Sequence, residues 1–175
     1  LEYLSKRFGL LDGVCVSGGE PTLYPDLPKF ISKLKSIGYL VKLDTNGTNP
    51  EMVKYLVENK LVDYIAMDIK NSEDNYNKTI GKDYDFGKIK TTIEYIINCG
   101  VDYEFRTTLV KSLHTFEDIQ KIAKLIAGAK KYYLQKFVDS GNCISSGLTA
   151  IDKKTATEYL EYLQKFIPST KLRGY

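Results

Sequence analysis

The sequence predicts an α/β protein built on a parallel sheet, and three observations support this. Short apolar segments alternate along the chain with amphipathic helical segments. The apolar segments are mostly continuous, which is typical of strands buried on both faces. Polar and charged residues recur where these segments end, at the edge where α/β folds place their ligands. A doubly wound sheet also fits the alternation, but several successive strands with polar ends favour a partial (βα)6 barrel of the TIM type.

The predicted strands are short and rich in Val, Ile, Leu and Tyr. They cover residues 14–16, 40–43, 64–69, 103–109 and 132–138.

Five amphipathic helices are predicted between and after these strands. Apolar residues keep helical spacing over residues 27–37, where Gly38 ends the helix, and over residues 86–97 and 116–126. The pair Asn49-Pro50 predicts an N-cap followed by proline at the first helical position. Asp152 is expected to cap the last helix.

Composition limits the classes of function. The 175 residues are expected to form a single domain over 1–175, and 43% hydrophobic and 27% charged residues are globular values. The net charge of +3 comes from scattered lysines without a basic stripe, so no nucleic acid is expected. No apolar run approaches the ~20 residues that span a bilayer, so no membrane association is expected.

The cysteines predict a reducing environment. There are three, Cys15, Cys99 and Cys143, an odd and widely spaced set that does not indicate a disulfide framework, so a cytoplasmic location is expected. Cys15 is expected to be a small buried residue of a strand.

Two other features concern the course of the chain. It begins at Leu1 inside a helix-like pattern, so we expect a piece truncated at the N-terminus, with the first strand of the barrel missing. The Gly/Ser-rich segment 139–150 is expected to be a mobile lid or a disordered stretch.

Polar residues lie at or near the C-terminal ends of four of the predicted strands. They are Ser17-Gly18-Gly19-Glu20, Asp44-Thr45-Asn46-Gly47, Asp68 with Lys70, and Arg106. Alone, each has an ordinary structural explanation: a tight turn, a common turn dipeptide, an ion pair, or the partner of a buried acid. His114, the only histidine, precedes a helix and is expected on the surface.

Together, these residues suit an amino acid attached to a nucleoside. Glu20 and backbone carbonyls can accept hydrogen bonds from an α-ammonium group. Arg106 and Lys70 can hold a carboxylate. Asp44 and the amide of Asn46 can bond sugar hydroxyls.

The segments SGGEPTL, KLDTNGTNP and VDYIAMDIK resemble, in order and spacing, the radical S-adenosylmethionine (SAM) superfamily. The similarity runs from about residue 10 to at least 106, and is greatest to activating proteins of glycyl-radical enzymes, especially the anaerobic ribonucleoside-triphosphate reductase type. The resemblance implies that the GGEP element binds the amino group of SAM and that Arg106 lies near its carboxylate. The SAM-binding residues that we expect are Ser17, Gly18, Gly19, Glu20, Asp44, Thr45, Asn46, Asp68, Lys70, Arg106 and Gln135, with Gln135 and Phe137 facing the adenine region.

One departure from the superfamily pattern limits this reading. The CxxxCxxC motif whose thiolates bind a [4Fe–4S] cluster is absent, and the three cysteines belong to separate elements and cannot replace it. No metal ligand and no catalytic residue is therefore assigned, and the chain itself is expected to be inactive. In the intact protein, the resemblance implies a reduced cluster that cleaves SAM, with flavodoxin or ferredoxin as reductant. The resulting radical would take hydrogen from a glycine of a partner such as anaerobic ribonucleotide reductase.

Three other functions stay open. The first is a small-molecule radical SAM enzyme similar to 7-carboxy-7-deazaguanine synthase. The second is a non-catalytic α/β module that binds a nucleoside or a phosphate, although no phosphate loop of the GxxxxGK type is present. The third is a folding scaffold without chemistry of its own.

Overall fold

The computed structural model describes residues 1–139, 141 and 146–175. The predicted lid over 139–150 lies in part outside the described residues. The chain divides into two compact units, Leu1–Asp68 with Gly87–Tyr103, and Ile69–Phe86 with Glu104–Tyr175. The expectation of one domain over 1–175 stays a prediction.

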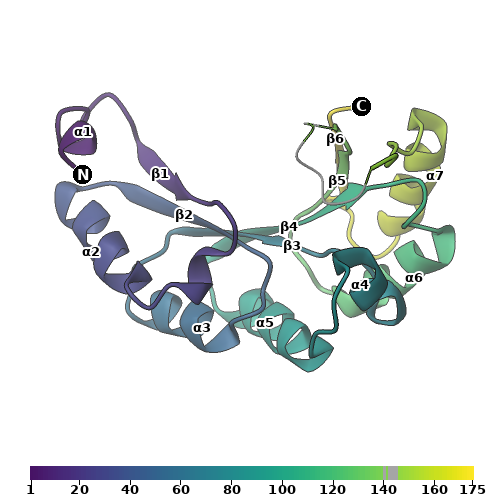
Figure 1. Ribbon diagram of the computed structural model, residues 1–175, viewed down its shortest axis with the longest axis horizontal. Helices are drawn as coiled ribbons and strands as arrows, with labels where there is room; N and C mark the ends of the chain where they lie inside the picture. Colours follow the sequence, from purple (N-terminus) through teal and green to yellow (C-terminus); the bar gives the residue numbers. More distant parts are fainter. Residues whose placement is uncertain (140, 142–145) are drawn as a thin grey trace. The chain divides into compact units, whose positions relative to one another are not determined.

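The first unit contains three parallel strands: β1 (Gly13–Val16), β2 (Leu40–Thr45) and β3 (Tyr64–Asp68). Its helices α2 (Leu27–Ile37), α3 (Pro50–Glu58) and α5 (Phe86–Asn98) lie along one face of these strands (Figure 1). The short helix α1 (Glu2–Ser5) precedes β1, and the 3-10 helix η1 (Pro21–Leu23) follows it. The core between strands and helices consists of fully buried aliphatic side chains, among them Ile31, Leu34, Val41, Leu43, Val53, Leu56 and Ile65.

Local signals set the helix ends of this unit. Helix α2 ends at Gly38, whose φ of 105° lies in the left-handed region that favours glycine. Helix α3 begins at Asn49, whose side chain accepts a hydrogen bond from the Met52 N–H, with Pro50 at the first helical position. Both helix ends are confirmed as predicted.

The second unit contains β4 (Asp102–Leu109), β5 (Tyr132–Lys136) and β6 (Lys171–Arg173), which are also parallel. Helix α6 (Phe116–Leu125) begins with a capping box between Thr115 and Asp118, and α7 (Lys153–Leu163) begins at the cap Asp152. Helix α4 (Glu73–Ile80) and strand β6 were not predicted. The strand has three residues, and only Tyr76 of α4 is buried, so neither shows a clear hydrophobic period.

The predicted fold class is confirmed. The strands follow the chain order β1 to β6, with helices between them, as in an unclosed barrel of the TIM type. The prediction for Cys15 is wrong, because the side chain is exposed: on β1 it alternates with Val14 and Val16 and so faces away from the helices. In the described ranges, no helix is both long and apolar enough to cross a membrane.

Candidate functional site

The turn after β1 leaves open space beside bare backbone. Gly18 and Gly19 have φ values of 101° and 55°, which L side chains rarely adopt. A Cβ atom built on either glycine meets no other atom within 4 Å. The backbone conformation therefore favours glycine at both positions, and the space next to them is open.

Glu20 ties this turn to the turn after β2. Its buried carboxylate accepts hydrogen bonds from the Thr22 N–H and hydroxyl through Oε1, at 3.2 and 2.6 Å. Oε1 also accepts from the Thr45 hydroxyl at 2.7 Å, and Oε2 accepts from the Asn46 N–H at 2.6 Å. These four donors give Glu20 a structural role that the sequence did not suggest, and they leave the backbone carbonyls as the natural acceptors for an ammonium group.

A second link holds the same two turns together. The Asn49 side-chain amide donates to the Thr22 carbonyl at 2.7 Å while its oxygen caps α3. Within the turn, the Thr45 hydroxyl accepts from the Gly47 N–H at 3.1 Å, and the Asn46 side chain accepts from the Thr48 N–H at 3.0 Å. The polar groups of both turns are thus fixed by one another.

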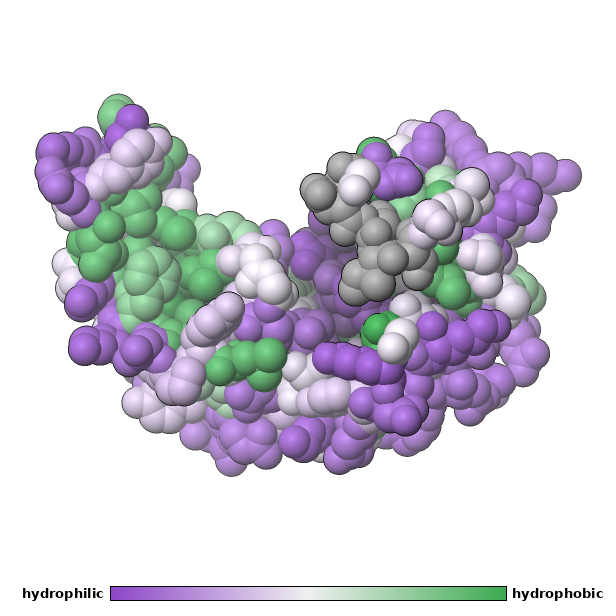
Figure 2. All heavy atoms as spheres, viewed as in Figure 1, coloured by the Kyte–Doolittle hydropathy of each residue, from purple (hydrophilic) through white to green (hydrophobic). Residues whose placement is uncertain are grey.

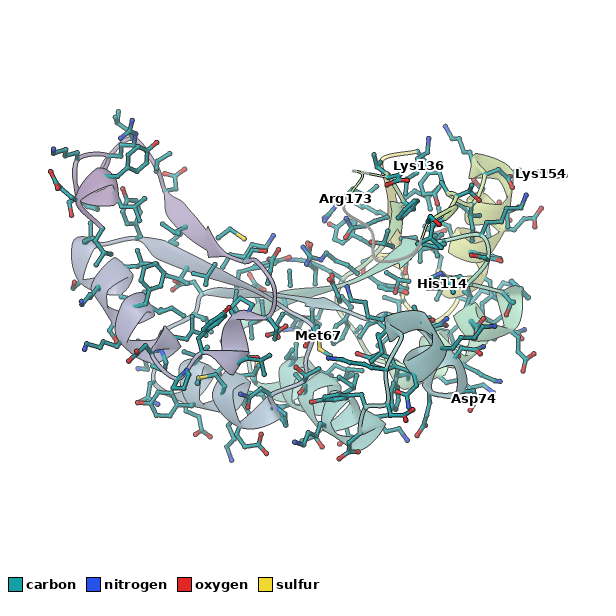
Figure 3. The ribbon with its side chains drawn as sticks, in the orientation of Figure 1. Met67, Asp74, His114, Lys136, Lys154 and Arg173 are labelled. Atoms are coloured by element: carbon teal, nitrogen blue, oxygen red, sulfur yellow. The ribbon has the colours of Figure 1, made fainter. Side chains whose placement is uncertain are left out.

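Gly47 is required by packing as well as by conformation. Its φ is 78°, and an added Cβ would lie 2.1 Å from Cε of Met67, a fully buried residue of β3 (Figure 3). The Gly47 carbonyl accepts a hydrogen bond from the buried Thr92 hydroxyl of α5 at 2.7 Å. The turn therefore contacts both β3, through Met67, and α5, through Thr92.

Asp44 and Asp68 lie near the C-terminal ends of neighbouring strands, where we expected them. Asp44 pairs in register with Ala66, and because side chains alternate along a strand, Asp68 shares the face of Ala66 and Asp44. Both carboxylates belong to half-buried residues. Lys42, two residues before Asp44 on the same face, places its ammonium 3.5 Å from Asp44 Oδ1.

A small pocket adjoins the glycine turn. It has a volume of about 260 Å³ and is lined by Val16, Ser17, Gly18, Pro21, Tyr24, Asp26, Leu27 and Phe30. Figure 2 shows that apolar side chains gather over β1 and α2 of this unit. A larger pocket, of about 650 Å³, is lined by residues of α2 and α3 and contains none of the predicted site residues.

In the second unit, the structure places Lys70, Arg106 and Gln135. Arg106 of β4 pairs with Tyr133 of β5, and Thr108 pairs with Gln135, so Arg106 and Gln135 share one face of these strands. The Ile69 N–H donates to the Arg106 carbonyl at 2.7 Å, which brings the main chain at Lys70 beside β4. The eight predicted residues from Ser17 to Asp68 thus lie in the first unit, and these three lie in the second.

Buried side chains hold the segment that contains Lys70. The prediction for His114 is wrong: the residue is 3% exposed, and its ring lies 2.9 Å from the Lys70 carbonyl, because the turn after β4 folds inward. Asp118 accepts hydrogen bonds from Ser72, Asn75 and Thr115. Burial acts to raise the pKa of Asp118, but these hydrogen bonds outweigh it and lower the pKa to about 2.

An ion pair on the same face as Arg106 was also missed from the sequence. Arg173 of β6 binds both carboxylate oxygens of the buried Glu104, at 3.0 and 3.3 Å, and its guanidinium lies 3.8 Å from the ring centre of Tyr133. This hydrogen bonding raises the pKa of Arg173. No sequence signal connects three single residues from three strands.

The cysteines do not form a cluster site in the part of the chain that the structure describes. Cys15 lies on β1 and Cys99 just after α5, while Cys143 lies outside the described residues. Among the described residues, no group of three or more Cys, His, Asp or Glu side chains is arranged to hold a metal. These residues do not fit a [4Fe–4S] cluster, whereas the open glycine turn and the carboxylates at the strand ends fit the ammonium and hydroxyl groups of SAM.

Comparisons with known proteins define the class. The family model of the Radical SAM superfamily matches residues 1–126, and the chain belongs to this superfamily of enzymes. It is similar to a Methanocaldococcus jannaschii protein named "Putative glycyl-radical enzyme activating enzyme MJ1227", with 40% identity over 135 residues, which are 74% of this chain and 56% of that protein. It is also similar to the 7-carboxy-7-deazaguanine synthase of Neisseria meningitidis serogroup B, with 38% identity over 53 residues, which are 30% of this chain and 22% of that protein.

A solved structure shows the same fold. A domain of the pyruvate-formate lyase-activating enzyme from Bacteroides vulgatus matches with a TM-score of 0.76 and 17% identity, over 94% of this chain and 100% of that domain. The chain spans about half the length of the M. jannaschii relatives that it matches.

Proposed function

We propose that this chain is the SAM-binding core of an enzyme that activates a glycyl-radical enzyme. The observation that carries the proposal is the open glycine turn at Gly18 and Gly19, locked by Glu20 to the turn after β2. Backbone carbonyls of this turn bind the ammonium group of SAM, and the carboxylates of Asp44 and Asp68 bind its ribose. Arg106 and Lys70 bind its carboxylate, with Thr45 and Asn46 shaping the pocket and Gln135 near the adenine.

The share of the chain that each match covers favours an activating enzyme over a deazaguanine synthase. The similarity to the activating-enzyme relative covers 74% of the chain, against 30% for the synthase. When bound in the whole protein, the cluster and SAM supply the radical chemistry of the superfamily. We propose a glycyl-radical enzyme, such as anaerobic ribonucleotide reductase, as the partner and flavodoxin or ferredoxin as the reductant. Without cluster ligands, the chain as it stands binds SAM but does not cleave it.

Calorimetric titration of the chain with SAM tests the binding site. Gly19→Val should abolish SAM binding while the circular dichroism spectrum stays native, because the side chain fills the space beside the turn. Gly128→Val is the matched control: Gly128 also has a positive φ, of 86°, and open space around it, but it lies after α6 in the second unit. Equal SAM affinity in both variants would refute the site.

The partner is tested separately. The chain should bind a purified glycyl-radical enzyme of the same organism in a pull-down, and should bind neither free nucleotides nor inorganic phosphate by calorimetry. A chain that binds inorganic phosphate, or that binds adenosine as tightly as SAM, would instead be a general nucleoside-binding module.

A further inference from the structure

We propose that His114 is a positioning residue that fixes the main chain at Lys70 and thereby aims the Lys70 ammonium at the carboxylate of SAM. This inference rests on the proposed function, since it assumes that Lys70 binds SAM. It concerns a residue that the family resemblance did not include and that the sequence had placed on the surface.

The contacts of the His114 ring carry the first step. Nε2 lies 2.9 Å from the Lys70 carbonyl oxygen, and Nδ1 lies 3.1 Å from the Val110 nitrogen and 3.3 Å from the Val110 carbonyl oxygen. A carbonyl oxygen only accepts hydrogen bonds, so Nε2 must carry a proton and donate it to Lys70. In the neutral ring, Nδ1 then has no proton and accepts a hydrogen bond from the Val110 N–H. The ring therefore joins the segment after β3 to the end of β4.

The neutral ring fits both contacts. Burial lowers the pKa of His114, although its hydrogen bonds to Lys70 and Val110 act in the opposite direction. With its hydrogen on Nε2, the uncharged ring donates to the Lys70 carbonyl and accepts from the Val110 N–H, so burial favours a form that connects the two segments.

The rest of the segment is held by contacts that do not involve the His114 ring. The Ile69 N–H donates to the Arg106 carbonyl, and the Ile69 carbonyl accepts from the Thr107 hydroxyl at 2.7 Å. On the other side, the Asn71 amide donates to the Leu113 carbonyl at 2.8 Å. His114 holds the peptide bond between Lys70 and Asn71, which lies between these two anchors.

This peptide determines where the lysine side chain starts. Lys70 has a long, flexible side chain, so its ammonium reaches a defined point only if the main chain is fixed. Displacements of about 1 Å in a positioning group can cost ~100-fold in function. The buried His114 ring, which donates to the Lys70 carbonyl, can fix this starting point.

Two variants separate the two ring nitrogens. His114→Gln can keep an N–H near the position of Nε2, whereas His114→Asn can replace only Nδ1. We expect His114→Asn to weaken SAM binding about tenfold in calorimetry and His114→Gln to stay within about threefold of the parent. Tyr159→Phe is the matched control, because the Tyr159 hydroxyl contacts the His114 carbonyl at 3.3 Å rather than the ring.

A mutant cycle and hydrogen exchange complete the test. In a Lys70→Met background, His114→Asn should cause no further loss of SAM affinity, and the amides of Lys70 and Asn71 should exchange faster in His114→Asn than in His114→Gln. Equal losses in both His114 variants, or a full loss that persists without Lys70, would overturn the positioning role. If Lys70→Met alone leaves SAM affinity unchanged, the proposed pocket fails instead, while the exchange rates still report on His114.

Discussion

Glu20 and Thr45 are 25 residues apart in the sequence, and the Thr45 hydroxyl donates a hydrogen bond of 2.7 Å to the Glu20 carboxylate. The contact joins the ends of two neighbouring parallel strands, β1 and β2. The Glu20 carboxylate of the GGEP element therefore holds the turn after β1 against the turn after β2.

The first prediction concerns this carboxylate. In Glu20→Gln, an amide N–H₂ group replaces one carboxylate oxygen and cannot accept hydrogen bonds from the four donors. At least one buried hydrogen bond is therefore lost, and the amide oxygen accepts more weakly than a carboxylate. We expect the free energy of unfolding to fall by roughly 1.5–3 kcal/mol in urea titrations, the range for hydrogen bonds to a charged group. Glu58→Gln, at an exposed ion pair with Lys54, should change it by less than about 0.5 kcal/mol. Similar values for the two variants would contradict the role of Glu20.

The second prediction concerns the packing of Gly47. Gly47→Ala should lower the melting temperature more than Gly128→Ala, because both glycines have positive φ but only Gly47 would contact Met67. The overpacking is expected to cost about 1–3 kcal/mol beyond the conformational strain. In a Met67→Ala background, which leaves room for the added methyl group, Gly47→Ala should cost less than in the parent, as measured by thermal unfolding. An equal cost in both backgrounds would assign the loss to the backbone alone.

The third prediction concerns acid stability. The pKa of Asp118 is about 2 in the folded chain, against an ordinary value of 3.8, so the unfolded chain binds the proton more tightly. The stability that Asp118 contributes is fully present above pH 3.8 and is lost as the pH falls toward 2. The shift corresponds to roughly 2 kcal/mol.

Asp118→Asn should remove this part of the pH dependence. Urea titrations between pH 2 and 5 would then show a smaller loss of stability for the variant than for the parent. Parallel curves for the two proteins would mean that Asp118 titrates normally.

The fourth prediction concerns Arg106. Arg106→Leu should remove a charge-assisted hydrogen bond to the carboxylate of SAM and weaken binding about ten- to a hundredfold in calorimetry. Methionine should lose affinity in parallel, whereas adenosine, which has no carboxylate, should not. A loss for adenosine of the same size would show a disturbed fold rather than a lost contact.

Most of the fold could be predicted from the sequence, because local chemistry determines it. Gly38, Asn49 and Asp152 end or begin helices through backbone conformation and caps, which act within four residues. The motif residues after β1, β2 and β3 could also be located, since a strand end is a local feature.

The residues that support the site could not be predicted in the same way. His114 and Glu104 matter through partners 44 and 69 residues away, and no local pattern marks such contacts. The structural role of Glu20 could not be predicted for a similar reason: its donors Thr45 and Asn46 are assigned to it only once β1 and β2 lie side by side.

The glycines of the two turns are expected to exclude substitutions for different reasons. At Gly18 and Gly19 the fold asks only for a left-handed backbone, which asparagine also adopts, and there is room for its side chain. In a library sorted first for folding and then for ligand capture, asparagine should survive the first sort at both positions and disappear in the second. At Gly47 it should disappear in the first sort, because Met67 occupies the space. The order in which substitutions are lost would thus separate the demands of folding from those of the ligand, position by position.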